Sequence, residues 1–302
     1  MAKKPDSETM QLRAHKAAVE KQVYEKAWND DSIQKTLHKV MIGNSADMKM
    51  VEDYSVHLIV TSPPYFNARE YSQWKTVDDY VADMKKTFNE CYRVLSPNRK
   101  FCLNISDLPE KGDSGVKWNP LGPRLLMACL DAGFELCDRI FWFKTPLKGF
   151  QYGSLPYPPS PLICDSIEYV YILRKQGKSD YKYATKIKKD ASRLMRAEYI
   201  EYTKQIWSIP RVRLKSNIDG HVAPFPDELV KRCIKLYSFV GDTILDPFAG
   251  SGTVAKVAIQ TKRNSISYEL KKEYLKYIKD KIQEASENLF LMPIVEYCNK
   301  DS

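Results

Sequence analysis

Residues 61–65, which read Thr-Ser-Pro-Pro-Tyr, combine groups that can bind and orient a flat ring bearing an amino group. The two prolines fix the backbone and lack amide donors, so the carbonyls of this turn remain as hydrogen-bond acceptors. Ser62 adds a hydroxyl and Tyr65 an aromatic face. The turn follows the apolar run Val56–Val60, and ligands of open α/β sheets bind at the carboxyl ends of strands. A Pro-Pro turn that only ends a strand is the alternative interpretation.

A second segment, residues 246–253, reads Asp-Pro-Phe-Ala-Gly-Ser-Gly-Thr and joins a predicted strand to a predicted helix. Gly250 and Gly252 allow a tight turn and close approach of a ligand. The third glycine of a dinucleotide-binding loop and the lysine of a P-loop are both absent. Glu269 ends the next predicted strand, 17 residues after Gly252, where its carboxylate can accept both hydroxyls of a ribose. The segment therefore predicts a site for an adenosine cofactor without phosphates.

The elements that must position these two segments alternate between short apolar runs and amphipathic stretches. Strands are predicted at His38–Ile42, Val56–Val60, Lys100–Ile105, Leu136–Phe143, Ile167–Leu173, Thr243–Asp246 and Ser265–Glu269. Helices are predicted at Ser7–Trp28, Thr76–Leu95, Pro120–Ala132, Pro226–Tyr237, Gly252–Gln260 and from Lys271 onward. This alternation is typical of an α/β fold with a doubly wound, mostly parallel, seven-stranded sheet of the Rossmann-like kind.

The chain of 302 residues divides into four expected parts. An N-terminal helical arm covers 1–36, and a catalytic half of the main domain covers 37–144. A recognition insertion is expected at 145–215, because it opens with a proline-rich loop and continues with a basic stretch. The cofactor-binding half covers 216–302.

Composition excludes several classes of protein. Hydrophobic residues make up 43% of the chain and charged residues 28%, as in ordinary globular proteins. The seven cysteines form no C-x-x-C pair and the four histidines no H-E-x-x-H motif, so we expect no metal site and reduced thiols. No apolar run approaches the roughly 18 residues of a membrane span. We therefore expect a cytoplasmic protein without a membrane partner.

The net charge of +9 is concentrated in one stretch. Between Arg174 and Lys215 thirteen Lys and Arg face four acids, which gives this stretch alone a charge of +9. Aromatic residues such as Tyr199 and Trp207 are interleaved with the basic ones. Basic side chains neutralise phosphates and aromatic rings stack on bases, so the stretch predicts DNA binding. A solvated, lysine-rich surface is the alternative. The candidate DNA-binding residues are Lys186, Lys188, Lys189, Arg193, Arg196, Arg211 and Arg213.

Over roughly residues 37–290 the sequence resembles the S-adenosylmethionine-dependent DNA amino-methyltransferases of bacterial restriction-modification systems. The resemblance is to the permuted β-group, in which the catalytic loop precedes the cofactor loop. Residues 221–226, His-Val-Ala-Pro-Phe-Pro, resemble the family's motif at the methionine end of the cofactor, and Gly43-Asn44-Ser45 resembles its Gly-Asp-Ser adenine loop. Asn44 departs from the usual aspartate. The implied cofactor-binding residues are Asn44, Ser45, Phe225, Asp246, Phe248, Gly250, Gly252, Thr253 and Glu269.

The resemblance implies direct transfer of a methyl group to the exocyclic amine of a base flipped out of the duplex. The implied catalytic residues are Ser62, Pro63, Pro64 and Tyr65. The Ser62 hydroxyl and the Pro63 carbonyl would accept from the amine, and Tyr65 would stack on the base. The chain has no Pro-Cys dipeptide, which excludes the cysteine-dependent methylation of cytosine carbon 5.

Ser62 favours N4 of cytosine as the methylated position, because family members that modify adenine N6 usually carry Asp or Asn there. Adenine N6 stays open as an alternative, as do an RNA or protein-amide methyltransferase and a catalytically silent DNA-binding relative. The expected partners are double-stranded DNA and, functionally, a cognate restriction endonuclease. The sequence leaves the oligomeric state open.

Overall fold

The computed structural model describes residues 7–66, 74–112, 115–145, 163, 165–178, 183–212, 226–289 and 293–299. Three earlier predictions fall wholly or mostly outside these residues: Arg213, the motif from His221 to Phe225, and the proline-rich loop after Thr145.

One sheet of nine strands forms the centre of the described structure. In spatial order the strands are β11 (Ile294–Asn299), β1 (Leu37–Ile42), β10 (Asn264–Glu269), β9 (Thr243–Asp246), β2 (Val56–Thr61), β3 (Leu95–Ile105), β7 (Ile167–Lys175), β6 (Phe134–Thr145) and β8 (Ile206–Pro210). Only β7 runs antiparallel to its neighbours in this sheet; all other described pairings are parallel. The predicted α/β class with a mostly parallel sheet is confirmed. A separate hairpin joins β4 (Leu108–Gly112) to β5 (Gly115–Asn119).

The sheet has nine strands where seven were predicted, and both additional strands lie at its edges. One of them, β8, lies inside the range 145–215 that we expected to be an insertion outside the core, and so does β7. Trp207 of β8 is completely buried, and the Trp142 indole donates to the Ile209 carbonyl at 2.8 Å. That range therefore supplies part of the core, because its apolar residues complete the sheet beside β6.

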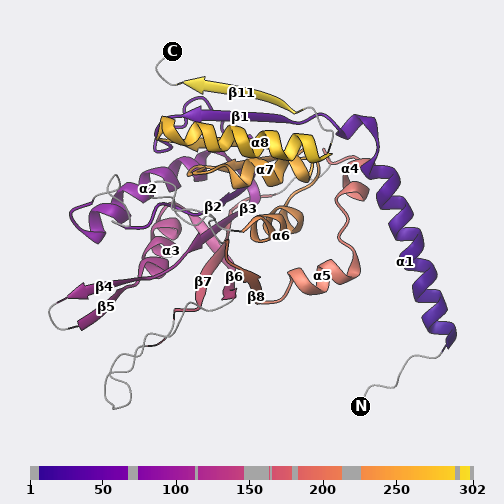
Figure 1. The fold of residues 1–302 in the computed structure, drawn as a ribbon, viewed down its shortest axis with the longest axis horizontal. Coiled ribbons are helices and arrows are strands. Elements are labelled where there is room, and N and C mark those ends of the chain that lie inside the picture. Colours follow the sequence, from indigo (N-terminus) through magenta and orange to yellow (C-terminus); the bar gives the residue numbers. More distant parts are fainter. Residues whose placement is uncertain are drawn as a thin grey trace.

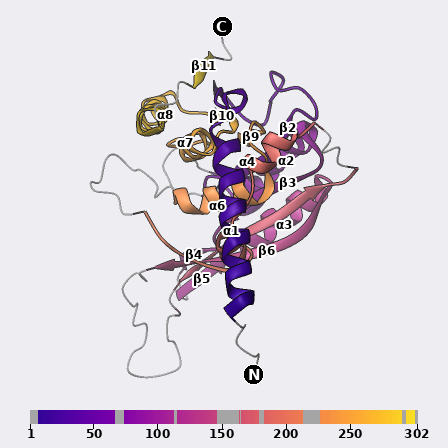
Figure 2. The same cartoon turned by 90° about the vertical axis from the view of Figure 1, so that its right-hand side faces the viewer.

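Helices cover both faces of the sheet (Figure 2). On one face lie α2 (Val77–Val94) and α3 (Leu121–Asp131); on the other lie α6 (Asp227–Tyr237), α7 (Thr253–Gln260) and α8 (Leu275–Leu289). Successive side chains of a strand point to opposite faces, so Ile59 of β2 packs in the cluster with α2 and α3 while Leu58 and Val60 pack with α6 and α7. Burial on both faces explains why β2 is apolar almost throughout.

Two predicted helix boundaries are confirmed. Thr76 caps α2: the Asp79 amide donates to the Thr76 hydroxyl and the Thr76 amide to the Asp79 carboxylate, each at 3.1 Å. Gly133 follows the last turn of α3 with a φ of +104°, a conformation that favours glycine.

The predicted helix at residues 7–28 is α1 (Ser7–Trp28), which lies beside α4 (Lys186–Ala191) at one edge of the sheet. In Figure 1 the arrows of β1 and β11 point left, away from α1 and α4 on the right. The two helices therefore lie at the amino ends of the parallel strands. Ala27 and Ala191 pack there with Val240, which precedes β9. None of the helices in the described parts of the chain is both long and apolar enough to cross a membrane.

Candidate active site

Four neighbouring strands deliver the predicted site residues to one edge of the sheet. Because β1, β10, β9 and β2 are adjacent and parallel, their carboxyl ends meet there. Gly43, Asn44 and Ser45 follow β1, Glu269 ends β10, residues 246–253 follow β9, and residues 62–65 follow β2. The structure thus brings together the described members of both predicted sets, which are separated by more than 180 residues in the chain.

Glu269 holds the glycine loop after β9. One carboxylate oxygen, Oε2, accepts from the Gly250 amide at 2.8 Å, and the other, Oε1, accepts from the Lys271 amide at 3.0 Å. The backbone of the same residue accepts from the Gly43 amide at 2.9 Å. Each carboxylate oxygen has two lone pairs, so these bonds leave acceptor capacity for hydroxyl groups of a ligand.

The loop needs glycine at two of its positions. Gly250 has a φ of +52° and Gly252 a φ of +85°, both in the left-handed region. A Cβ on Gly252 would also lie only 3.0 Å from the Ile278 Cα of α8. Gly252 therefore permits both the turn and the close packing of α7 against α8.

Asp246 joins the cofactor loop to the catalytic loop. Its Oδ1 accepts from the Thr61 hydroxyl at 2.6 Å and from the Phe248 amide at 3.1 Å, and the residue is 1% exposed. Burial raises the pKa of Asp246 to about 7, and the nearby charge of Glu269 adds to the rise, while the two hydrogen bonds oppose it. In this structure Asp246 orders the two loops; its predicted contact with a cofactor stays a prediction.

The catalytic loop is anchored at both ends. Pro63 is buried, whereas Ser62, Pro64 and Tyr65 are partly exposed. The Tyr65 phenol donates to Oε2 of Glu168 on β7 at 3.1 Å. Burial, followed by the charge of Glu168, raises the pKa of Tyr65 well above its ordinary value. Tyr65 therefore stays a neutral hydrogen-bond donor across the physiological pH range.

The loop after β1 is held from the side of α2. The Asn44 side chain accepts from the Ala46 amide at 2.9 Å, and the Ser45 hydroxyl lies 3.4 Å from that of Thr87, both buried. The predicted contacts of Asn44 and Ser45 with an adenine stay predictions.

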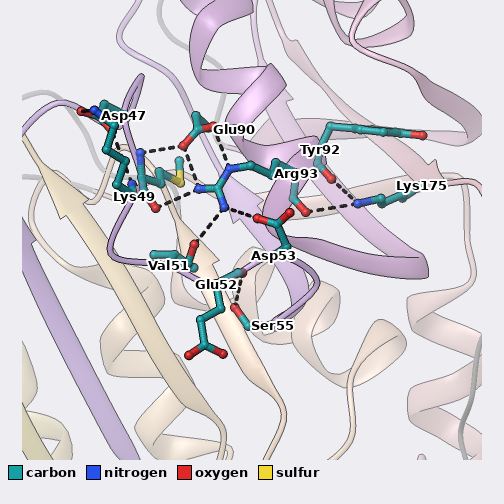
Figure 3. A network of polar contacts seen from close by, with 11 residues as sticks. Asp47, Lys49, Val51, Glu52, Asp53, Ser55, Glu90, Tyr92, Arg93 and Lys175 are labelled. Atoms are coloured by element: carbon teal, nitrogen blue, oxygen red, sulfur yellow. Dashed lines mark hydrogen bonds and ion pairs between the residues drawn. The ribbon is translucent and has the colours of Figure 1, made fainter.

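Arg93 at the end of α2 fixes the rest of that loop, as Figure 3 shows. Its guanidinium binds both carboxylate oxygens of Glu90, each at 2.9 Å, and donates to the carbonyls of Met48 at 2.9 Å and Val51 at 3.0 Å. A fifth bond reaches Asp53 at 2.5 Å. The planar guanidinium supplies five donors in a fixed geometry, so one side chain can order the whole connection from β1 to β2.

Lys281 is a residue of the site that the sequence reasoning missed. From α8 its ammonium donates to the hydroxyls of Ser251 at 2.9 Å and Thr253 at 2.6 Å, both in the glycine loop. Burial lowers the pKa of Lys281 to about 8. No spacing rule links a lysine in a C-terminal helix to this loop, so the sequence alone carries no signal for it.

The predicted DNA-binding residues are divided between the two edges of the sheet. Lys186, Lys188 and Lys189 lie on α4 at the amino edge; Arg193 follows that helix, and Arg196 begins α5 (Arg196–Tyr202). Arg211 follows β8, and its amide donates to the Thr145 carbonyl at 3.2 Å. Because β8 runs parallel to β6, Arg211 lies at the carboxyl edge, where the catalytic loop also lies.

Six cysteines belong to the described residues, and all have free thiols; four of them, Cys91, Cys102, Cys129 and Cys233, are buried. Within the same part of the chain, no three His, Cys, Asp or Glu side chains gather as a metal site would require.

The family model for DNA methylases of the N6/N4 type matches residues 56–280, from β2 to α8. The chain belongs to this DNA methylase family. The matched range contains the catalytic loop, the glycine loop and Glu269, so the edge described above is the part of the chain that defines a member of the family.

Three relatives illustrate the similarity. The Type II methyltransferase M.MjaI of Methanocaldococcus jannaschii is 31% identical over 296 residues, which cover 88% of this chain and 97% of the relative. A DNA modification methylase of Thermus thermophilus, solved in complex with S-adenosyl-L-methionine, has a TM-score of 0.72 and 27% identity, and covers 88% of this chain and 100% of its own. The PvuII DNA methyltransferase, named cytosine-N4-specific, has a TM-score of 0.61 at 21% identity and covers 87% and 96%; this likeness concerns the fold.

Proposed function

We propose that this DNA methylase transfers the methyl group of S-adenosylmethionine to N4 of a cytosine flipped out of duplex DNA, as a member of the permuted β-group. One observation carries the proposal. The turn with Ser62 and Tyr65 and the glycine loop after Asp246 leave adjacent strands, and the Thr61–Asp246 hydrogen bond of 2.6 Å ties them together. A cofactor bound by the second loop would present its methyl group to a base held by the first.

The residues around this edge suit an adenosine cofactor. Glu269 offers two carboxylate oxygens beside the glycine loop, where the hydroxyls of a ribose can be accepted. Gly250 and Gly252 let the backbone approach the ligand without a side chain in between. The methylase of Thermus thermophilus was solved with S-adenosyl-L-methionine, which supports the same cofactor for this chain. S-adenosylmethionine supplies an electrophilic methyl group on a sulfonium.

The chain's own task is then to place the amine and stabilise its change of geometry. An aromatic amine is a poor nucleophile because its lone pair is delocalised into the ring. Acceptors at the Ser62 hydroxyl and the Pro63 carbonyl pull the amine toward a tetrahedral nitrogen as the methyl group arrives. The Tyr65 ring stacks on the flipped base and excludes water from one of its faces.

We propose that duplex DNA approaches the carboxyl edge, where Arg211 is placed to meet phosphates. A six-residue strand is about 20 Å long, so the lysines of α4, at the opposite edge, reach only DNA that continues around the side of the molecule. We further propose that the protein acts in the cytoplasm and that a cognate restriction endonuclease is its functional partner.

The test is modification sequencing of DNA from cells that express this protein alone, followed by digestion to nucleosides and mass measurement. N4-methylcytosine is the expected product. N6-methyladenine would move the proposal to the other target of the same family, and 5-methylcytosine would contradict the direct mechanism. The Ser62→Ala variant should lower turnover far more than cofactor affinity, because the lost hydrogen bond acts on the amine in the transition state.

A further inference from the structure

Glu168 brings a buried carboxylate to the catalytic loop from the antiparallel strand β7. Since β7 runs against its neighbours, its first residues lie at the edge where the other strands end. Oε2 of Glu168 accepts from the Tyr65 phenol at 3.1 Å and from the Asn104 amide at 3.0 Å. Oε1 lies 3.6 Å from the ammonium of Lys144, and the Glu168 and Lys144 side chains are each only 12% exposed.

The partners of Glu168 are themselves held by the sheet. The Asn104 amide also donates to the Tyr169 carbonyl at 3.1 Å, and Lys144 also pairs with Asp165 at 2.8 Å. Glu168, Asn104 and Lys144 belong to three adjacent strands, β7, β3 and β6. The carboxylate is therefore a fixed point of the sheet, whereas Tyr65 belongs to a loop.

A hydrogen bond to a phenol oxygen acts at the far end of the side chain. It restricts rotation about χ1 and thereby sets the direction in which the ring leaves the backbone. A ring held in this way is already placed for stacking before a base arrives, so less conformational entropy is lost when the base binds. Burial raises the pKa of Glu168, while the charge of Lys144 and the bonds from Asn104 and Tyr65 oppose the rise.

We propose that Glu168 is a positioning residue that holds the Tyr65 ring where a flipped base stacks on it. This inference rests on the proposed function, and it assigns a role to a residue outside both loops. Glu168 acts through Tyr65, so removing its carboxylate should matter only while the Tyr65 hydroxyl is present.

The experiment is a double-mutant cycle with Glu168→Ala, Tyr65→Phe, the double variant and the wild type. Two quantities are measured: kcat for transfer of a radiolabelled methyl group to plasmid DNA that carries the target site, and the fluorescence of 2-aminopurine in place of the target base. Glu168→Ala should lower kcat about tenfold in the wild-type background but less than about twofold in the Tyr65→Phe background, a coupling of ~1.4 kcal/mol. The 2-aminopurine signal should fall in parallel, and cofactor affinity should not change.

Two control variants separate positioning from general damage. Glu168→Gln keeps an acceptor oxygen for Tyr65, so its kcat should stay within about threefold of the wild type. Glu135→Ala removes another glutamate of the same sheet, one that pairs with Arg174 at 2.6 Å away from the site, and should leave kcat unchanged. Thermal unfolding shows whether each variant is folded.

Equal losses from Glu168→Ala in both backgrounds would overturn the proposal, and so would a Glu168→Gln variant as impaired as Glu168→Ala. If Glu168→Ala does not fold, Tyr65→Phe decides alone: base capture as strong as in the wild type contradicts the role of the tether. A wild-type protein that methylates no DNA would instead contradict the proposed function, while the unfolding free energies of the same four proteins would still report the contact.

Discussion

Two aspartates at opposite ends of β9 show how the two edges of the sheet differ. Asp242 precedes the strand and Asp246 ends it, and both are 1% exposed. Asp242 faces the buried guanidinium of Arg99 at 3.2 Å and also accepts from the Tyr183 phenol at 3.0 Å. The hydrogen bonds that Asp246 receives come from a hydroxyl and a backbone amide, and its pKa is raised to about 7.

The difference separates stability from function. At the amino edge a buried acid is paired with a buried base, which is how a fold tolerates ionised groups in its interior. At the carboxyl edge a buried acid with a raised pKa ties together the two loops that the DNA methylase family uses. Strongly shifted pKa values are concentrated at functional sites, so the pKa of Asp246 independently supports the assignment of this edge.

The largest expected effect is on the amino edge. Asp242→Asn leaves the Arg99 guanidinium buried without its counter-charge, and breaking such a pair destabilises a protein by about 3–5 kcal/mol. The free energy of unfolding in urea should fall by that amount, while cofactor affinity measured at a temperature where the variant is folded should stay unchanged. A variant as stable as the wild type would show that this edge does not depend on the ion pair.

The second expected effect is a pH dependence from Asp246. Its folded-state pKa of about 7 lies above the ordinary value near 4, so the neutral carboxyl stabilises the fold fully below pH ~4. This contribution is lost as the pH rises to about 7 and is at most ~4 kcal/mol. Asp246→Asn does not titrate, so the stability of the unliganded wild type relative to this variant should decrease from pH 4 to pH 8. A constant difference would contradict the buried, raised-pKa state of Asp246.

The third prediction concerns Glu269 at the carboxyl edge. Glu269→Ala removes the acceptor for the Gly250 and Lys271 amides and the proposed acceptor for the ribose hydroxyls. Charge-assisted hydrogen bonds contribute about 1.5–3 kcal/mol each, so affinity for S-adenosylmethionine should fall tenfold or more in calorimetry. Glu269→Gln keeps one oxygen and should lose less. Unchanged affinity in Glu269→Ala would remove Glu269 from the proposed cofactor site.

The smallest expected effect distinguishes the basic residues of the two edges. If DNA binds at the carboxyl edge, Arg211→Glu should reduce the slope of log binding constant against log salt by about 0.9, the value for one phosphate contact. The triple change of Lys186, Lys188 and Lys189 to glutamine should reduce it less, because α4 lies at the opposite edge. The reverse result would place the DNA across α4 and α1.

The sequence predicts the parts of the site that local patterns encode. The prolines of residues 61–65, Gly250 and Gly252 each require a particular backbone geometry, and the buried strands before them are recognisable from their apolar runs. Glu168 is different: it lies 103 residues after Tyr65 in the chain, and only the pairing of β3 with β7 brings it to the loop. Contacts of this kind depend on the topology of the sheet and carry no local signal.

The edge strands were missed for a related reason. In β8 buried Trp207 and Ile209 alternate with exposed neighbours, but this short pattern lies within a stretch dominated by charge. The strand β11 comes after the last helix, where the helical pattern of α8 was expected to continue. Five- or six-residue strands carry too few apolar positions to stand out against such surroundings.

The place of β1 in the sheet has a consequence for synthesis on the ribosome. β1 is made early, yet its two neighbours, β10 and β11, are made more than 200 residues later. At about 5–20 residues per second, β1 waits roughly ten seconds or more before either partner leaves the exit tunnel. During that time the nascent chain carries an unpaired apolar strand. Protease digestion of ribosome-bound chains of increasing length should therefore cut near β1 until β10 has emerged, and early protection would show that another segment covers it first.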